Sequence, residues 1–137
     1  MSIFFSILSA AYIAGIFLLA DSPMVSEAAP FNPYSLLHIP LYGILTILLV
    51  LSFRRKPSNP INPTNPSNSI NLLIPGSIAL VVAIADEIHQ AYIPSRDASV
   101  TDVFLDIVGI SLCLLLIKRI GQISGFSKIP KFLRRIP

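Results

Sequence analysis

Residues 85–109 read ADEIHQAYIPSRDASVTDVFLDIVG and lie between two strongly apolar runs. The stretch holds five of the seven acidic residues in the chain, together with His89, Gln90 and Arg96. Pro94 stops the preceding helix, so only a very short connection leads to the next one, which predicts an antiparallel helical hairpin. Charged groups are costly to place at the end of a membrane segment. We therefore expect the function of the protein to reside here.

The composition is that of a membrane protein. Of the 137 residues, 53% are hydrophobic and 12% are charged, and the mean hydropathy is +0.74. Four apolar segments predict helices at about 2–20, 36–53, 71–93 and 99–119. Each can span a bilayer core of ~30 Å, which needs roughly 20 helical residues, and each is too continuously apolar for a barrel strand. The predicted fold is an all-α polytopic membrane protein, in which residues 1–120 form one antiparallel bundle of four transmembrane helices.

The basic residues predict the orientation of this bundle. Nine of the ten follow the second or the fourth apolar segment, and only Arg96 does not. By the positive-inside rule, both termini and the loop 54–70 are cytoplasmic, and residues 94–98 face outward across the plasma membrane. Because the net charge of +3 is sorted by membrane side, it does not indicate nucleic-acid binding. Residues 121–137 are predicted to be a basic amphipathic cytoplasmic tail on the inner leaflet.

Cleavage of the first segment as a signal peptide is an alternative, with small residues near position 28 as the cleavage site. No Lys or Arg precedes its apolar core, and the apolar run is long, so retention as a membrane helix is the better interpretation.

Polar residues near the end of the third predicted helix share one face. Asp86, His89 and Gln90 have i, i+3 and i+4 spacing, and Glu87 points about a quarter turn away. The fourth helix then begins near Ser99, which is a favourable N-cap residue.

Asp102 and Asp106 have different explanations. Asp102 stands three residues after Ser99 in a capping-box-like pair, so capping explains it as well as a functional role does. Asp106 lies a turn further in, where an ionised carboxylate needs a partner or becomes neutral. Both belong to a stripe that is completed by Gly109 and Cys113, and these small residues predict that the stripe packs inside the bundle.

The second helix contributes His38 and Tyr42, one turn apart and at the same predicted level as the acidic residues. A packing role and a functional role for His38 are about equally supported. Arg96 either pairs with a neighbouring carboxylate or binds an anionic ligand group through its planar fork.

Three sets of candidate residues follow from these patterns. The candidates for acid–base catalysis are His38, His89, Asp102 and Asp106. The candidates for ligand binding are His38, Tyr42, Asp86, Glu87, Gln90, Arg96, Ser99 and Asp102. The candidates for a divalent metal are Asp86, His89, Asp102 and Asp106, although such helical spacings are common on any helix.

These residues resemble the VanZ-like family, whose pattern is close to DE-x-x-Q-x-x-x-P-G-R-x-x-S-x-x-D-x-x-x-N-x-x-G. The matching positions are Asp86, Glu87, Gln90, Pro94, Arg96, Ser99, Asp102 and Gly109, and His38 and Tyr42 match an earlier H-x-x-x-Y. The chain departs from the family pattern at Ser95, where a glycine is usual, and at Asp106, where an asparagine is usual. Tyr34 and Ser35 replace the Asp-Lys that often precedes the histidine.

The resemblance implies a small bacterial integral membrane protein, from a family first associated with low-level resistance to the glycopeptide teicoplanin. One hypothesis is a protein that binds a cell-envelope component or a glycopeptide and contributes to antibiotic tolerance. A second is a membrane enzyme, such as a metal-dependent hydrolase or transferase, that acts on a lipid-linked or peptidoglycan-related substrate. A third is a structural helical scaffold. The sequence leaves the choice between catalysis and binding open, as it does the oligomeric state.

Overall fold

The computed structural model describes residues 2–20, 33–53, 71–94 and 98–126. Its elements are the helices α1 (Ile3–Ala20), α3 (His38–Phe53), α4 (Leu73–Gln90) and α5 (Val100–Phe126), and a short 3-10 helix, η1 (Pro33–Leu37), which leads into α3. Within these ranges, four helices are long and apolar enough to cross a membrane. In lipid, only the helix satisfies the backbone of such segments internally, which is why these apolar runs fold as they do.

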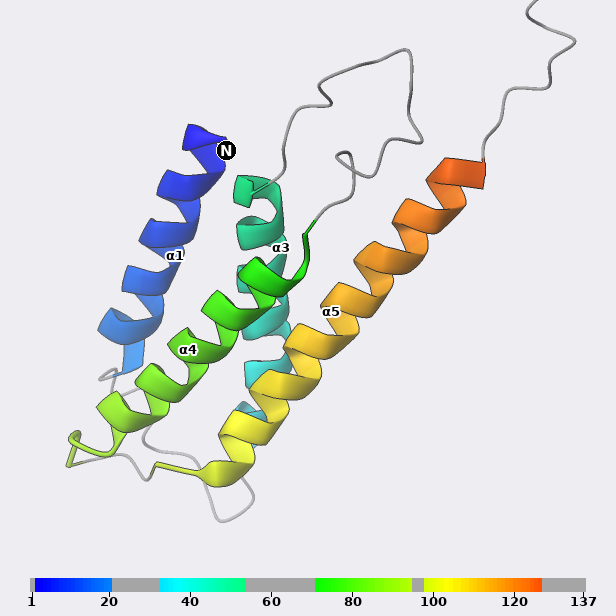
Figure 1. Ribbon diagram of the computed structural model, residues 1–137. Coiled ribbons are helices and arrows are strands. Elements are labelled where there is room, and N and C mark those ends of the chain that lie inside the picture. The colour runs from blue at the N-terminus through cyan, green and yellow to red at the C-terminus, as the bar shows by residue number, and fades with distance from the viewer. Residues whose placement is uncertain (1, 21–32, 54–70, 95–97, 127–137) are drawn as a thin grey trace, which may run out of the picture.

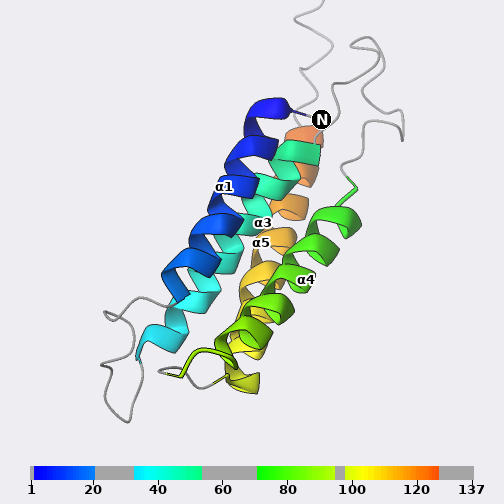
Figure 2. The ribbon, with the colours of Figure 1, turned by 90° about the vertical axis from the view of Figure 1, so that its left-hand side faces the viewer.

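The four long helices run alternately up and down, so the bundle is antiparallel (Figures 1 and 2). α3 lies at its centre and contacts α1, α4 and α5. The first residues of α1 meet the last residues of α3, where the Ser2 N–H donates to the Ser52 carbonyl at 2.9 Å. The opposite end of the bundle brings together the start of α3, the end of α4 and the start of α5.

Small residues set how closely the helices approach one another. Ala79 and Ala83 on α4 are fully buried against the core that Tyr42 and Leu45 form on α3. At the crossing of α3 and α5, a Cβ atom added to Gly109 would collide with the Ile39 carbonyl. Only glycine allows the two backbones to lie this close. The structure thus confirms that the stripe through Gly109 and Cys113 packs inward.

Two helix boundaries differ from the sequence prediction. α4 ends at Gln90, and residues 91–94 form a turn in which Tyr92 and Ile93 donate to carbonyls three residues back. The residue before a proline is disfavoured in the helical conformation, so Pro94 ends the regular helix early. α5 continues to Phe126, into the segment that was predicted to be the tail. The remainder of that tail lies outside the described residues.

Large apolar side chains remain exposed along every long helix, for example Phe4, Leu18, Val81 and Leu116. In water such a surface would be highly unfavourable, whereas in a bilayer it contacts lipid. The chain is therefore a multi-pass membrane protein.

Candidate functional site

Three helices place polar side chains at one end of the bundle, which we term the acidic end. It comprises His38 and Tyr42 from α3, Asp86, Glu87 and Gln90 from α4, and Asp102 and Asp106 from α5. All but His38 are buried, and His38 is partly buried. The end of each helix thus carries its polar residues to one shared level, as the sequence predicted.

His38 and Asp106 are directly bonded across the α3–α5 crossing. The distance between His38 Nδ1 and Asp106 Oδ1 is 2.9 Å, and the Asp106 side chain is fully buried. Gly109 lies one turn beyond Asp106 and makes this distance possible, because its missing Cβ lets α5 approach the backbone of Ile39. Asp106 holds the imidazole in one orientation, a function that carboxylates commonly serve for histidine in active sites and metal sites.

A second buried carboxylate, Asp86, accepts hydrogen bonds from side chains of two helices. Its Oδ2 accepts from the Tyr42 hydroxyl at 3.2 Å and from Gln90 Nε2 at 3.1 Å. Gln90 lies four residues after Asp86, so the pair meets on one face of α4 as its spacing predicted. The Tyr42 ring in turn stacks with the His38 ring, at a centroid distance of 6.3 Å. Asp86 is therefore positioned by a network that also includes the imidazole.

Glu87 makes the capping contact that the sequence offered as one of two explanations for Asp102. The backbone N–H of Ser99 donates to Glu87 Oε2 at 2.9 Å. Ser99 is an N-cap, as predicted, since its hydroxyl accepts from the Thr101 N–H at 3.2 Å. The reciprocal half of the capping box, however, comes from α4 and not from Asp102. Asp102 is thereby free of a capping bond and faces the acidic end.

Three carboxylate oxygens of this end have no hydrogen-bond partner within the part of the chain that the structure describes. They are Glu87 Oε1, Asp102 Oδ1 and Asp106 Oδ2. The exposed fractions of these residues are 6%, 8% and 0%. Buried acceptors without donors are rare and costly in folded proteins, and they call for a cation, a proton or a ligand.

One donor atom each from His38, Glu87 and Asp102 lies within 4.8 Å of the others. This trio shares only Asp102 with the metal candidates chosen from the sequence. His89, another of those candidates, is exposed, and its ring packs edge-on against Phe17 of α1 at a centroid distance of 5.5 Å. The structure does not bring His89 into the trio. Arg96 and its neighbours Ser95 and Asp97 lie outside the described residues.

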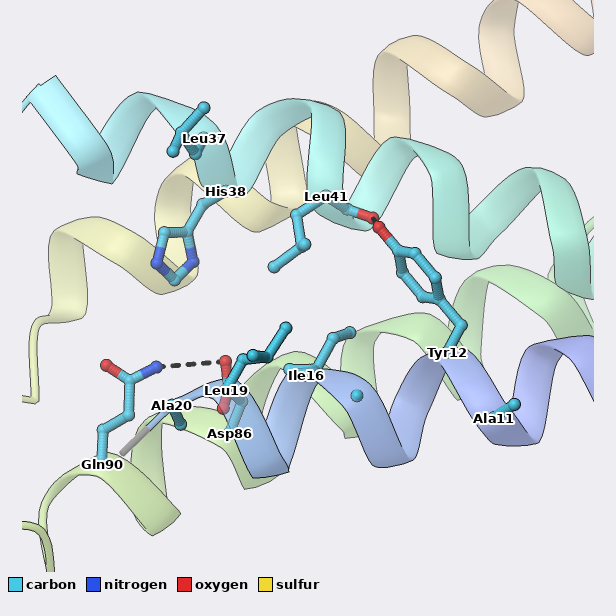
Figure 3. Close-up of a pocket in the computed structure, with 11 residues that line it drawn as sticks. Ala11, Tyr12, Ile16, Leu19, Ala20, Leu37, His38, Leu41, Asp86 and Gln90 are labelled. Atoms are coloured by element: carbon cyan, nitrogen blue, oxygen red, sulfur yellow. Dashed lines mark hydrogen bonds between the residues drawn. The ribbon is translucent and has the colours of Figure 1, made fainter. Parts of the chain in front are cut away.

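A cavity of about 470 Å³ opens between α1, α3 and α4 beside this network (Figure 3). His38, Asp86 and Gln90 line one end, and the remaining walls are mostly apolar. Its volume is within the usual range for ligand pockets of roughly 300–1,000 Å³. The apolar wall includes Ile16 and Leu41, and Figure 3 shows the His38 imidazole and the Asp86–Gln90 pair facing one another at the polar end.

Sequence reasoning missed the contribution of α1 to this cavity. Tyr12 and Gly15 line it, and the Tyr12 hydroxyl donates to the Leu41 carbonyl at 3.1 Å, which ties α1 to α3. Polar patterning could not reveal this wall, because α1 is almost uniformly apolar. Tyr12, a polar aromatic residue in the middle of that segment, was its one visible signal.

The comparisons with known proteins agree with the family resemblance that the sequence motifs indicated. A model of the VanZ/LLP1 family matches residues 34–121, which include all of α3 and α4 and most of α5. No curated protein and no solved structure matches the chain. The matched segment contains both halves of the pattern, from His38 and Tyr42 to Gly109, and it covers more than half of the 137 residues. The chain belongs to the VanZ/LLP1 family.

Proposed function

We propose that this protein binds an amphiphilic component of the bacterial cell envelope, or a glycopeptide, and thereby contributes to tolerance of envelope-directed antibiotics. The observation that carries the proposal is the shape and chemistry of the cavity. Mostly apolar walls from α1, η1 and α3 lead to an end formed by His38, Asp86 and Gln90. A ligand with an apolar part and a hydrogen-bonding group satisfies both regions at once.

The polar end of the cavity is preorganised. Tyr42 and Gln90 both donate to Asp86, and Asp106 orients His38, so each group is held before a ligand arrives. Preorganised groups lose little conformational entropy on binding, which raises affinity. Asp86 and the carbonyl oxygen of Gln90 accept hydrogen bonds, which favours ligand hydroxyl, amide or amine groups.

Gly15 offers a way to test the cavity without disturbing the bundle. A Cβ atom added at Gly15 meets nothing within 4 Å, so Gly15→Leu extends into open space along the cavity wall. Ala14→Leu is the matched control, because Ala14 is an exposed neighbour on the same helix and does not line the cavity.

The measurement is the melting temperature of the detergent-purified protein with teicoplanin, lipid II or undecaprenyl phosphate. A compound that binds the folded state raises the melting temperature by mass action. We expect one of these compounds to raise the melting temperature of wild type and of Ala14→Leu but not that of Gly15→Leu. Equal stabilisation of all three proteins, or of none, would contradict binding in this cavity.

The acidic end is proposed to face outward. Lys118 and Arg119 lie toward the opposite end of α5, and Arg54, Arg55 and Lys56 follow α3 directly in the sequence. A cysteine at the exposed position Ala98, introduced with Cys113→Ala, should react with a membrane-impermeant maleimide in intact cells. Reaction only after permeabilisation would reverse the proposed orientation.

A second candidate, a membrane enzyme, is favoured by one specific contact. The carboxylate–imidazole pair of Asp106 and His38 resembles an oriented general base, and His38 lines the cavity. Mass spectrometry of lipid II incubated with the protein distinguishes the two candidates. Conversion that is lost in Asp106→Asn indicates an enzyme, whereas bound but chemically unchanged lipid II indicates a binding protein.

A further inference from the structure

We infer that His38, Glu87 and Asp102 form a binding site for one divalent transition-metal cation. One donor atom from each lies within 4.8 Å of the others. Metal–ligand bonds of about 2.0–2.2 Å place two opposed ligand atoms at most about 4.4 Å apart. Small side-chain rotations are enough to close the remaining gap. The three residues come from α3, α4 and α5, so the cation would join three of the four helices.

The unpartnered oxygens support this site independently of the spacing. Glu87 uses only Oε2 to accept the Ser99 N–H, and Oε1 has no partner in the described part of the chain. Asp102 Oδ1 is likewise unpartnered in the described part of the chain, and Glu87 and Asp102 are only 6% and 8% exposed. A cation coordinated by these two oxygens would remove the cost of leaving them without donors.

The contact between His38 and Asp106 matches the second shell of a metal-bound histidine. Metal-ligating histidines usually donate one ring N–H to a carboxylate, which fixes the tautomer and makes the other nitrogen a better ligand. With Nδ1–H donated to Asp106 Oδ1, the lone pair of His38 lies on Nε2. Asp106 is thus a positioning residue for this site and not one of its ligands.

The charge of the acidic end also favours a cation. Asp86, Glu87, Asp102 and Asp106 gather at one level, while the lysine and arginine of the described residues, Lys118 and Arg119, lie far along α5. One imidazole nitrogen and two carboxylate oxygens suit Zn²⁺, Mn²⁺ or Co²⁺ better than Mg²⁺ or Ca²⁺, which prefer all-oxygen sites.

The site is separate from the proposed ligand cavity except for His38. Glu87 and Asp102 do not line the cavity. Metal binding can therefore fail while ligand binding in the cavity persists, and the reverse also holds, so the two proposals are tested independently.

The test is a Co²⁺ titration of tag-free, chelator-treated, detergent-purified full-length protein, followed by visible absorption. Wild type should bind one Co²⁺ per chain and release it to an excess of Zn²⁺. Glu87→Gln and Asp102→Asn, which preserve side-chain shape, should each weaken binding by at least tenfold. His89→Ala is the matched control, because it removes an exposed histidine at the same end that lies outside the trio.

The positioning role of Asp106 has its own readout. Asp106→Asn should keep a stoichiometry of one Co²⁺ per chain while its affinity falls roughly 10–100-fold. Size-exclusion profiles in chelator establish that each variant is folded. The inference is overturned if folded wild type binds no Co²⁺, if Asp102→Asn and Glu87→Gln bind it as tightly as wild type, or if His89→Ala abolishes binding.

Discussion

The two ends of the bundle both bury polar groups between helices, but they satisfy them differently. At the end that we term the serine end, Ser6, Ser9 and Ser52 are bonded within and between α1 and α3. Ser6 Oγ donates to the Ser2 carbonyl at 3.0 Å and lies 2.6 Å from Ser52 Oγ, and Ser9 Oγ donates to the Phe5 carbonyl at 2.8 Å. At the acidic end, three buried carboxylate oxygens have no donor among the described residues.

This difference distinguishes polar groups that only hold helices together from polar groups that await a ligand. A serine hydroxyl carries its own proton, so it can donate a hydrogen bond to the helical carbonyl one turn back. A carboxylate accepts only, and several carboxylates at one level exceed the donors that nearby helices supply. Such a surplus of acceptors is unfavourable for folding by itself, and it is understandable where a cation or a ligand completes the site.

The most damaging single change should be Gly109→Ala, which acts at the α3–α5 crossing beside the acidic end. The added Cβ would collide with the backbone at Ile39, and backbone yields less readily than a side chain. We expect a loss of about 3 kcal/mol in the free energy of unfolding, measured by denaturant titration in micelles. Gly43→Ala is the control, because its Cβ would lie at an ordinary 3.8 Å from the Gly109 carbonyl oxygen. Equal effects of the two would mean that the crossing tolerates a wider separation.

In contrast to Gly109→Ala, Asp102→Asn should raise the free energy of unfolding of the metal-free protein. It replaces a buried carboxylate, one oxygen of which has no hydrogen-bond donor among the described residues, with a neutral amide, and we expect the free energy of unfolding to rise by about 1.5 kcal/mol in the presence of chelator. Asp106→Asn should show no such gain, because it breaks the buried contact between Asp106 and His38. A loss of stability in Asp102→Asn would make that residue a structural element, like the serines, and would break the comparison between the ends.

Tyr42→Phe should lower the free energy of unfolding by about 1 kcal/mol, since it removes a hydrogen-bond donor to the buried Asp86 carboxylate. Tyr12→Phe provides the comparison, because Tyr12 donates to a helical carbonyl, a neutral acceptor. Thermal unfolding of both variants under the same conditions gives the ranking. An unchanged stability of Tyr42→Phe would mean that Asp86 does not depend on the Tyr42 hydroxyl.

The smallest effect should come from the serine end. Ser52→Ala removes a contact between two hydroxyls of neighbouring helices, and such interhelical bonds average roughly 0.6 kcal/mol in membranes. The same denaturant titration measures it, with the exposed Ser77→Ala as control. The variant should leave Co²⁺ binding at the acidic end unchanged, and an altered affinity would show that the two ends are coupled through α3.

Much of this architecture could be predicted from the sequence. Continuous apolar runs of about 20 residues predicted four spanning helices, and the short connection after Pro94 predicted the hairpin of α4 and α5. Helical spacing correctly placed Asp86 and Gln90 on one face and predicted the inward face of α5 through Gly109. It was wrong for His89, which is exposed, whereas Glu87 is buried. The separated motifs around His38 and Asp86 pointed to the family that the comparison then established.

The partners of individual side chains depended on the tertiary structure. Periodicity assigns a residue to a helix face, but it does not specify how far that helix is rotated or how closely its neighbour approaches. The Ser99 N–H donates to Glu87 from α4 and not to Asp102, and the His89 ring packs against Phe17 and not within the trio. The pairing of His38 with Asp106 likewise required the close crossing at Gly109, and the cavity required α1 to pack against α3 and α4. Apolar periodicity is a property of one helix, whereas a site built between helices depends on distances that only their packing determines.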